Sequence, residues 1–114
     1  MLKTRHKDGV AIIDVSGTVR FGPEANQFHN TIIEVFEKGN PKILLNLAAL
    51  DRFDSSGLGS LVSAYASITR REGALKLLNP GHRVADLLKI TNTAGLFEIF
   101  TDEATALSSF SPAR

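Results

Sequence analysis

The spacing of apolar residues changes abruptly at Asp54, and this change constrains the fold more than any other feature of the sequence. Residues 42–47 form a short, nearly continuous apolar run after Pro41, which is typical of a strand buried on both faces. The residues that follow the turn recur at the three- and four-residue spacing of one helical face: Leu58, Leu61, Val62, Tyr65, Ile68 and Thr69. The segment Asp54–Gly59 therefore predicts a junction between a buried strand and a helix.

Weaker signals on both sides of this junction complete a fold. The N-terminal half predicts strands over Leu2–His6 and Val10–Ser16 with a hairpin turn at Asp8-Gly9, a loop over Gly17–Pro23 and a helix over Glu24–Lys38. The C-terminal half predicts a strand over Ala74–Leu78, a helix over Val84–Ile90, a short strand within Ala94–Phe100, a helix from Asp102 to about Phe110, and a frayed end over Ser111–Arg114. A strand, a helix and a second strand in succession favour a right-handed crossover between parallel strands. We therefore expect one α/β domain over residues 1–114, with a mixed, mostly parallel sheet and helices largely on one side.

Composition narrows the classes of function. The chain has 114 residues, with 13 basic and 12 acidic side chains, so no net field attracts nucleic acid or an anionic membrane. It contains no cysteine, which excludes disulfides and thiolate chemistry. Its first seven residues are charged and lack the apolar core of a secretory signal, and no apolar run approaches the ~20 residues that span a bilayer. We expect a soluble, cytoplasmic protein that neither inserts into a membrane nor binds nucleic acid directly.

Motifs for catalysis and for cofactors are absent or incomplete. Gly57-Leu58-Gly59 resembles the start of a dinucleotide-binding loop, but Val62 occupies the third glycine position and no acidic residue ends the next strand. Close packing of backbone and helix is the simpler explanation for these glycines. The sequence has no nucleophile elbow around its serines, and its three histidines lack metal-ligand spacing. We expect no catalytic residues, no metal, no cofactor and no enzymatic activity.

The junction itself carries an acid and two hydroxyls in succession. Asp54, Ser55 and Ser56 are all residue types that cap a helix N-terminus, so any one of them can accept the first backbone N–H groups. One cap needs only one such residue. Three of them, followed by Gly-Leu-Gly, exceed what capping requires, and a phosphate on a serine here would gain from the helix dipole and from free N–H groups.

At these residues the chain resembles the STAS family, whose domain is shared by sulfate transporters and bacterial anti-sigma factor antagonists. Three blocks carry the resemblance: Ile43–Leu47 through Asp54–Gly59, Leu75–Pro80, and Thr93–Phe97. The Asp-Ser-Ser-Gly-Leu-Gly block is the specific part. The resemblance covers essentially the whole chain and implies the same α/β fold.

The resemblance also implies a function and a site. In antagonists of this family, the first serine of the block is phosphorylated by an anti-sigma factor that is also a serine kinase, and here that serine is Ser55. The unphosphorylated protein binds the anti-sigma factor and releases a sigma factor, and a metal-dependent serine phosphatase resets the cycle. The resemblance places partner binding at Arg20, Asp54, Ser55, Ser56, Gly57, Leu58 and Gly59.

Two positions depart from the common family pattern. Gly17-Thr18-Val19-Arg20 replaces Gly-Glu-Leu-Asp or a similar sequence, so a base stands where an acid is common, and Arg52 replaces an apolar or aromatic residue. Both arginines bear on the choice of partner. A second function fits the same resemblance, namely an unphosphorylated STAS scaffold or accessory subunit of the stressosome or transporter-associated kind.

Overall fold

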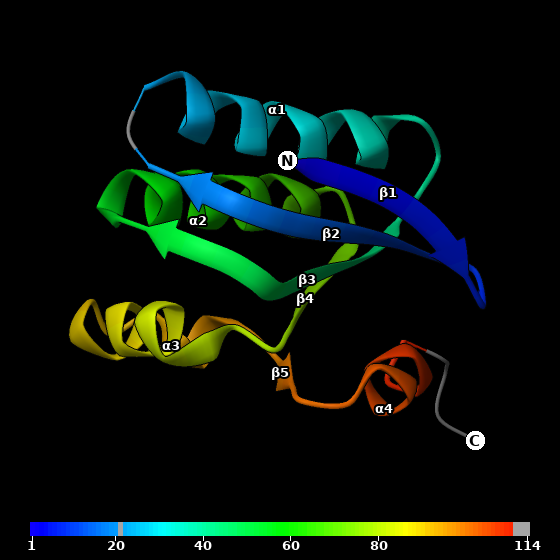
Figure 1. The fold of residues 1–114 in the computed structure, drawn as a ribbon. Helices are drawn as coiled ribbons and strands as arrows, with labels where there is room; N and C mark the ends of the chain where they lie inside the picture. The colour runs from blue at the N-terminus through cyan, green and yellow to red at the C-terminus, as the bar shows by residue number, and fades with distance from the viewer. Residues whose placement is uncertain (21, 111–114) are drawn as a thin grey trace.

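The computed structural model describes residues 1–20 and 22–110, which form five strands packed with four α-helices (Figure 1). In chain order the elements are β1 (Leu2–Lys7), β2 (Val10–Val19), α1 (Pro23–Glu37), β3 (Lys42–Phe53), α2 (Ser55–Arg70), β4 (Ala74–Leu78), α3 (Gly81–Ile90), a short 3₁₀ turn (Ala94–Leu96), β5 (Ile99–Phe100) and α4 (Glu103–Ser108). The prediction that the last four residues fray concerns residues 111–114, which lie outside this description. The elements otherwise follow the predicted order.

The five strands form one sheet in the order β1-β2-β3-β4-β5. β1 and β2 pair antiparallel as the predicted hairpin, and each later strand pairs parallel to the one before it. β3 and β4 are parallel with Lys42 opposite Ala74, and the helix between them begins at Ser55. The predicted strand, helix and strand around the Asp54 junction, and the mixed, mostly parallel sheet, are therefore confirmed.

β1 ends one residue later than predicted, at Lys7, and two further strands are longer by several residues. β2 continues through Gly17–Val19, which we had expected in a loop, and β3 continues from Ala48 to Phe53, beyond the apolar run. These extensions pair with each other, and register shifts lie between Asp14 and Ser16 and between Gly17 and Thr18. Gly17 has a φ of +81°, a conformation that suits glycine and that accompanies such an irregularity. Backbone pairing therefore extends the strands where side-chain pattern does not.

Smaller differences concern the helices of the C-terminal half. α3 begins at Gly81, not at Val84, because the backbone passes from Pro80, the N-cap, directly into the first helical turn. α4 ends at Ser108, two residues short of the predicted end. Its N-cap is Asp102, whose side chain accepts the backbone N–H of Thr105 at 2.9 Å.

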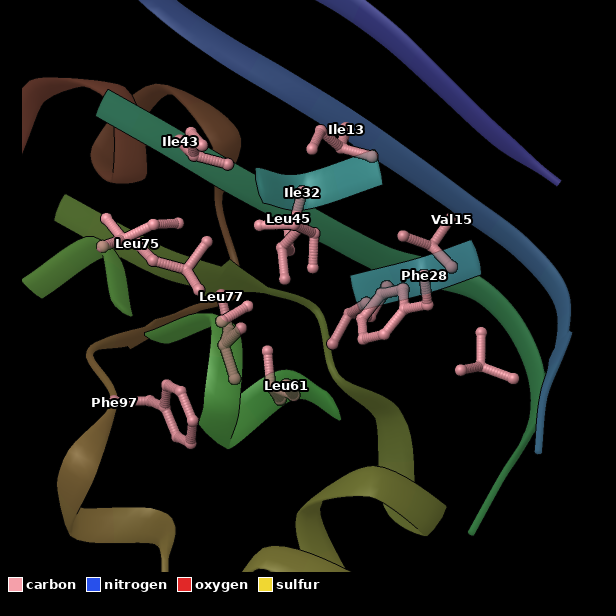
Figure 2. Close-up of a cluster of buried hydrophobic side chains, with 14 of the residues drawn as sticks. Ile13, Val15, Phe28, Ile32, Ile43, Leu45, Leu61, Leu75, Leu77 and Phe97 are labelled. Carbon is pink, nitrogen blue, oxygen red and sulfur yellow. The ribbon is translucent and has the colours of Figure 1, made fainter. Parts of the chain in front are cut away.

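The main core lies between one face of the sheet and the helices α1, α2 and α3. Alternate residues of β2, β3 and β4 point into it, as Ile13, Leu45 and Leu77 do in Figure 2, and each of these three is fully buried. Phe28 and Ile32 of α1 pack on the same face, with Leu61 of α2 and Phe97 alongside (Figure 2). Helices largely on one side of the sheet are therefore confirmed.

The opposite face of the sheet carries a smaller core beneath α4. Its buried members are Val10, Ile12, Leu44, Leu78, Ala106, Leu107 and Phe110. Arg5 of β1 fixes the start of α4, because its guanidinium donates to Glu103 Oε1 at 2.6 Å and to Asp14 Oδ2 at 2.7 Å. Lys76 fixes the end, because its Nζ donates to the carbonyl of Ser109 at 2.9 Å and lies over the ring of Phe110.

Candidate functional site

The structure settles which residue caps α2. Asp54 has extended backbone geometry, and its Oδ1 accepts the N–H groups of Ser56 at 3.0 Å and Gly57 at 3.1 Å. Asp54 is therefore the N-cap. Ser55, the first residue of the helix, is exposed, and within the described part of the chain its hydroxyl has no hydrogen-bond partner. Ser56 is only partly exposed, so of the two hydroxyls Ser55 is the more accessible to another protein.

The two glycines of the block have different roles. A Cβ on Gly57 would lie 2.7 Å from the carbonyl oxygen of Val19 and 2.8 Å from the Phe53 ring, so only glycine lets α2 start this close to the sheet. A Cβ on Gly59 would meet nothing within 4 Å. The close-packing explanation that the sequence suggested for both glycines therefore applies to Gly57 alone. Leu58, between them, is buried in the main core and anchors the first turn of α2.

Arg20 directly follows the carboxyl end of β2, which ends at Val19. Its backbone N–H donates to Glu24 Oε1 at 3.1 Å, and its side-chain Nε lies 3.9 Å from the same oxygen. The hydroxyl of Thr18 donates to the other carboxylate oxygen of Glu24 at 2.8 Å. These hydrogen bonds, with that of Thr18 the strongest, hold the pKa of Glu24 below its usual range, while the nearby carboxylate of Asp54 opposes the shift.

All of these groups meet at one edge of the sheet, because parallel strands end on the same side. In Figure 1 the arrowheads of β2 and β3 point to the end of the molecule where α1 and α2 begin. Val19 of β2 contacts the start of α2 through its carbonyl oxygen, and Arg20 follows it. The structure thus places the Asp54–Gly59 block and Arg20 at a common edge, with Glu24 between strand and helix.

A shallow groove of about 510 Å³ runs along this edge between α1 and α2. Its walls are small or polar residues: Gly22, Ala25, Asn26, His29, Ser56, Gly59, Ser60 and Ser63. Gly59 thus shapes a surface and not an internal contact. A neighbouring cleft of about 590 Å³ opens on the other side of Phe53, between the end of β3 and the start of α3.

Among the described residues, no histidine lies within hydrogen-bonding distance of Ser55 or Ser56. The histidine that approaches any serine in the described structure is His29, whose Nε2 lies 3.4 Å from Ser63 Oγ, and its other ring nitrogen faces an amide oxygen of Asn30. No group of three or more histidine or carboxylate side chains gathers in metal-binding geometry among residues 1–20 and 22–110. Nor does any helix in that part of the chain have the length and apolarity to cross a bilayer.

Two features of the site were not predicted from the sequence. Glu24 was predicted as the first residue of a helix, yet its side chain turns back to the end of β2 and binds Thr18, a contact that depends on the unpredicted extension of that strand. The cleft beside Phe53 likewise needs the end of β3, which the apolar pattern did not reveal. A proline at the start of α1 with an acid directly after it was the available signal, since acids favour the first helical turn.

The sequence matches one protein-family model and two similar proteins from Thermotoga. A family model described as the STAS domain matches residues 1–106 and agrees with the family resemblance of the sequence. A candidate anti-sigma factor antagonist of Thermotoga neapolitana is 35% identical over 74 residues, which are 65% of this chain and 66% of that protein. A similar candidate antagonist from Thermotoga maritima is 31% identical over the same length.

Solved structures agree with these sequence matches. The crystal structure of the candidate antagonist TM1081 of Thermotoga maritima is 25% identical and has a TM-score of 0.86, over 95% of this chain and 92% of the other. The phosphorylated form of SpoIIAA, a cell fate determinant of Bacillus, has a TM-score of 0.75 over 97% of this chain and 100% of the other. At 18% identity, the likeness to SpoIIAA shows a shared fold.

Proposed function

Because this chain belongs to the STAS domain family, we propose that it is an anti-sigma factor antagonist switched by phosphorylation of Ser55. The observation that carries the proposal is the position of Ser55: it is exposed at the first position of α2, and Asp54 caps the helix in its place. The hydroxyl is thus available to a kinase. The names of the Thermotoga relatives support the antagonist role.

The partner of the unphosphorylated form is an anti-sigma factor that is also a serine kinase. Binding at Asp54–Gly59 and Arg20 sequesters this partner and releases a sigma factor. Phosphorylation of Ser55 ends the binding, and a metal-dependent serine phosphatase restores it. The protein works by binding alone, in the cytoplasm, without catalysis of its own, without a cofactor, and without direct contact with nucleic acid or insertion into a membrane.

Electrostatic repulsion gives an estimate of how much phosphorylation lowers the affinity for the partner. A phosphate adds about 1.5 to 2 negative charges to Ser55, directly after the carboxylate of Asp54. Two unit charges ~4 Å apart at a partly buried contact interact by roughly 4 kcal/mol. A third of that energy corresponds to nearly a tenfold change in affinity. The helix dipole stabilises the phosphate within the domain, so it does not restore the contact with the partner.

The test uses three variants and the kinase partner from the same organism. We expect Ser55→Asp to bind the anti-sigma factor at least tenfold more weakly than wild type, whereas Ser55→Ala binds it and resists phosphorylation. Ser56→Ala is the matched control, since it removes the neighbouring hydroxyl and leaves Ser55 and the Asp54 cap in place. Calorimetric titration and a phosphorylation assay measure both properties.

Two outcomes would contradict the proposal. If Ser56→Ala alone escapes phosphorylation while Ser55→Asp binds like wild type, the modified serine is Ser56. If intact-mass measurement of the protein from its native host shows no phosphate under any growth condition, the scaffold function is correct and the edge is a permanent contact surface.

A further inference from the structure

The cleft beside Phe53 is a second surface that the proposed switch does not use. It encloses about 590 Å³ between the end of β3 and the start of α3. Its lining combines apolar and charged side chains: Leu50, Asp51, Arg52, Phe53, Pro80, Gly81, His82, Arg83 and Val84. Val84 is buried, and Leu50 and Phe53 are partly buried against the main core, so these residues form an apolar floor.

The lining of the cleft has more arginines than carboxylates, and its arginines are not paired within the described part of the chain. Neither Arg52 nor Arg83 has an ion pair or a side-chain hydrogen bond anywhere in the described part of the chain, and both are exposed. By contrast, Arg5, Arg20 and Arg71 each lie within 4.0 Å of a carboxylate. Asp51 is the one carboxylate in the lining, against two guanidinium groups and the imidazole of His82. The cleft therefore offers guanidinium donors for carboxylates from another molecule.

The cleft is also continuous with the switch serine. Phe53 lines it, and the ring of Phe53 lies against the position of Gly57 in the first turn of α2. Arg52 and Ser55 are three positions apart in the chain, which limits the distance between their Cα atoms to about 11 Å. A protein that covers Ser55 can therefore reach the cleft with a neighbouring segment.

We propose that the cleft binds an acidic segment of the partner protein, with a carboxylate side chain on Arg52 and Arg83 and an apolar side chain on the floor of Leu50, Phe53 and Val84. This inference rests on the proposed function, because the segment belongs to the protein that covers Ser55. The proposed contact also gives phosphorylation of Ser55 a second way to weaken partner binding. Phosphate and acidic segment have the same sign of charge, and the Cα atoms of Ser55 and Arg52 are separated by at most about 11 Å, so at low ionic strength phosphorylation repels the segment.

The first experiment tests the cleft without the partner. The probe is a fluorescein-labelled hexapeptide of alternating leucine and glutamate, and its matched control is the leucine and glutamine peptide of the same length. We expect the glutamate peptide to bind at least fivefold more tightly than the glutamine peptide and to shift the amide NMR signals of residues 50–53 and 80–84. We expect Arg52→Glu and Arg83→Glu each to weaken the glutamate peptide at least fivefold.

A matched variant controls for the change in net charge. Arg70 is also an exposed arginine, at the far end of α2, so Arg70→Glu changes the charge of the protein equally without touching the cleft. We expect Arg70→Glu to bind the peptide like wild type. Equal binding of both peptides, or an equal loss in all three variants, would overturn the proposal. Displacement of the peptide signals by ATP at lower concentration would assign the cleft to nucleotides instead.

The second experiment separates this inference from the proposed function. The unphosphorylated protein and its Arg52→Glu and Arg83→Glu variants are titrated against the anti-sigma factor used above. We expect a loss of at least fivefold in each variant, and a weaker dependence of affinity on salt. If phosphorylation of Ser55 abolishes binding while both variants bind like wild type, the cleft inference fails and the switch stands. If the variants lose affinity while phosphorylation has no effect, the switch fails and the cleft remains a docking site.

Discussion

At the scale of single residues, we expect alanine substitutions at Gly57 and Gly59 to change the free energy of unfolding in opposite directions. Gly57→Ala forces a methyl group against the Val19 carbonyl and the Phe53 ring, so we expect a loss of about 1 to 3 kcal/mol in the free energy of unfolding. Gly59→Ala has open space around it and removes a flexible residue from a helix, so we expect a gain of about 0.5 to 1 kcal/mol. Urea denaturation of both variants measures the difference. Equal stability of the two variants would show that α2 does not depend on the close approach at Gly57.

The sequence could not have separated these two glycines. Both stand in one short motif at the start of a helix, and only the distance from Gly57 to a backbone carbonyl on another strand distinguishes them. The same holds for the cap. Asp54, Ser55 and Ser56 have similar capping propensities, and the extended backbone of Asp54 decides among them. The sequence therefore located the turn between strand and helix, while the structural role of each residue in that turn required tertiary contacts.

At the scale of elements, the attachment of α4 predicts a dependence on pH. Hydrogen bonds from Arg5 lower the pKa of both Asp14 and Glu103, so these carboxylates stabilise the folded state at neutral pH. This stabilisation is complete above their ordinary pKa range and is lost as the pH falls through their lowered values in the folded protein. We expect Arg5→Met to lose about 1 kcal/mol of stability near pH 7, and progressively less in acid, because the three side chains remain partly exposed.

Chemical denaturation of wild type and Arg5→Met across acid and neutral pH measures this effect. Lys38→Met is the control, because its ion pair with Glu34 is exposed on the surface of α1 and should contribute little at any pH. An Arg5→Met variant with the same pH dependence as wild type would show that the contact between β1 and α4 contributes nothing to stability.

Elements were predicted best where their burial is complete. The start of β3, β4 and the inner face of α2 are apolar in the pattern that each structure requires, and the sequence located all three. The ends of β2 and β3 were missed because they extend past β4, which pairs only with residues 42–46 of β3. There the side chains are mostly exposed or partly exposed, so pairing of the two backbones stabilises the strands without an apolar signal.

At the scale of the whole molecule, the proposed switch changes a surface and leaves the fold intact. The Cα radius of gyration is 12.9 Å, close to the roughly 13 Å of a compact chain of this length. Ser55 is exposed, and its phosphate displaces no buried contact. We expect phosphorylation to change the melting temperature by no more than about 3 °C, since the helix dipole and the nearby carboxylates act in opposite directions by fractions of 1 kcal/mol.

Amide NMR spectra of both forms test this expectation. Shift changes should be confined to the edge where β2 and β3 end and to the first turns of α1 and α2, while β1 and α4 keep their signals. Changes that reach the contact between Arg5 and Glu103 would show that phosphorylation rearranges the domain and does not simply block its surface.

The order of strands in the sheet is also their order in the chain, and this has a consequence for how the protein is made. Each strand pairs with the one synthesised just before it, so a growing chain on the ribosome always finds its partner strand already present. Folding can therefore proceed by addition of strands from the N-terminus, because each strand pairs with its neighbour in the sequence. The contact between Arg5 and Glu103 joins residues 98 positions apart, so it forms only when nearly the whole chain has emerged.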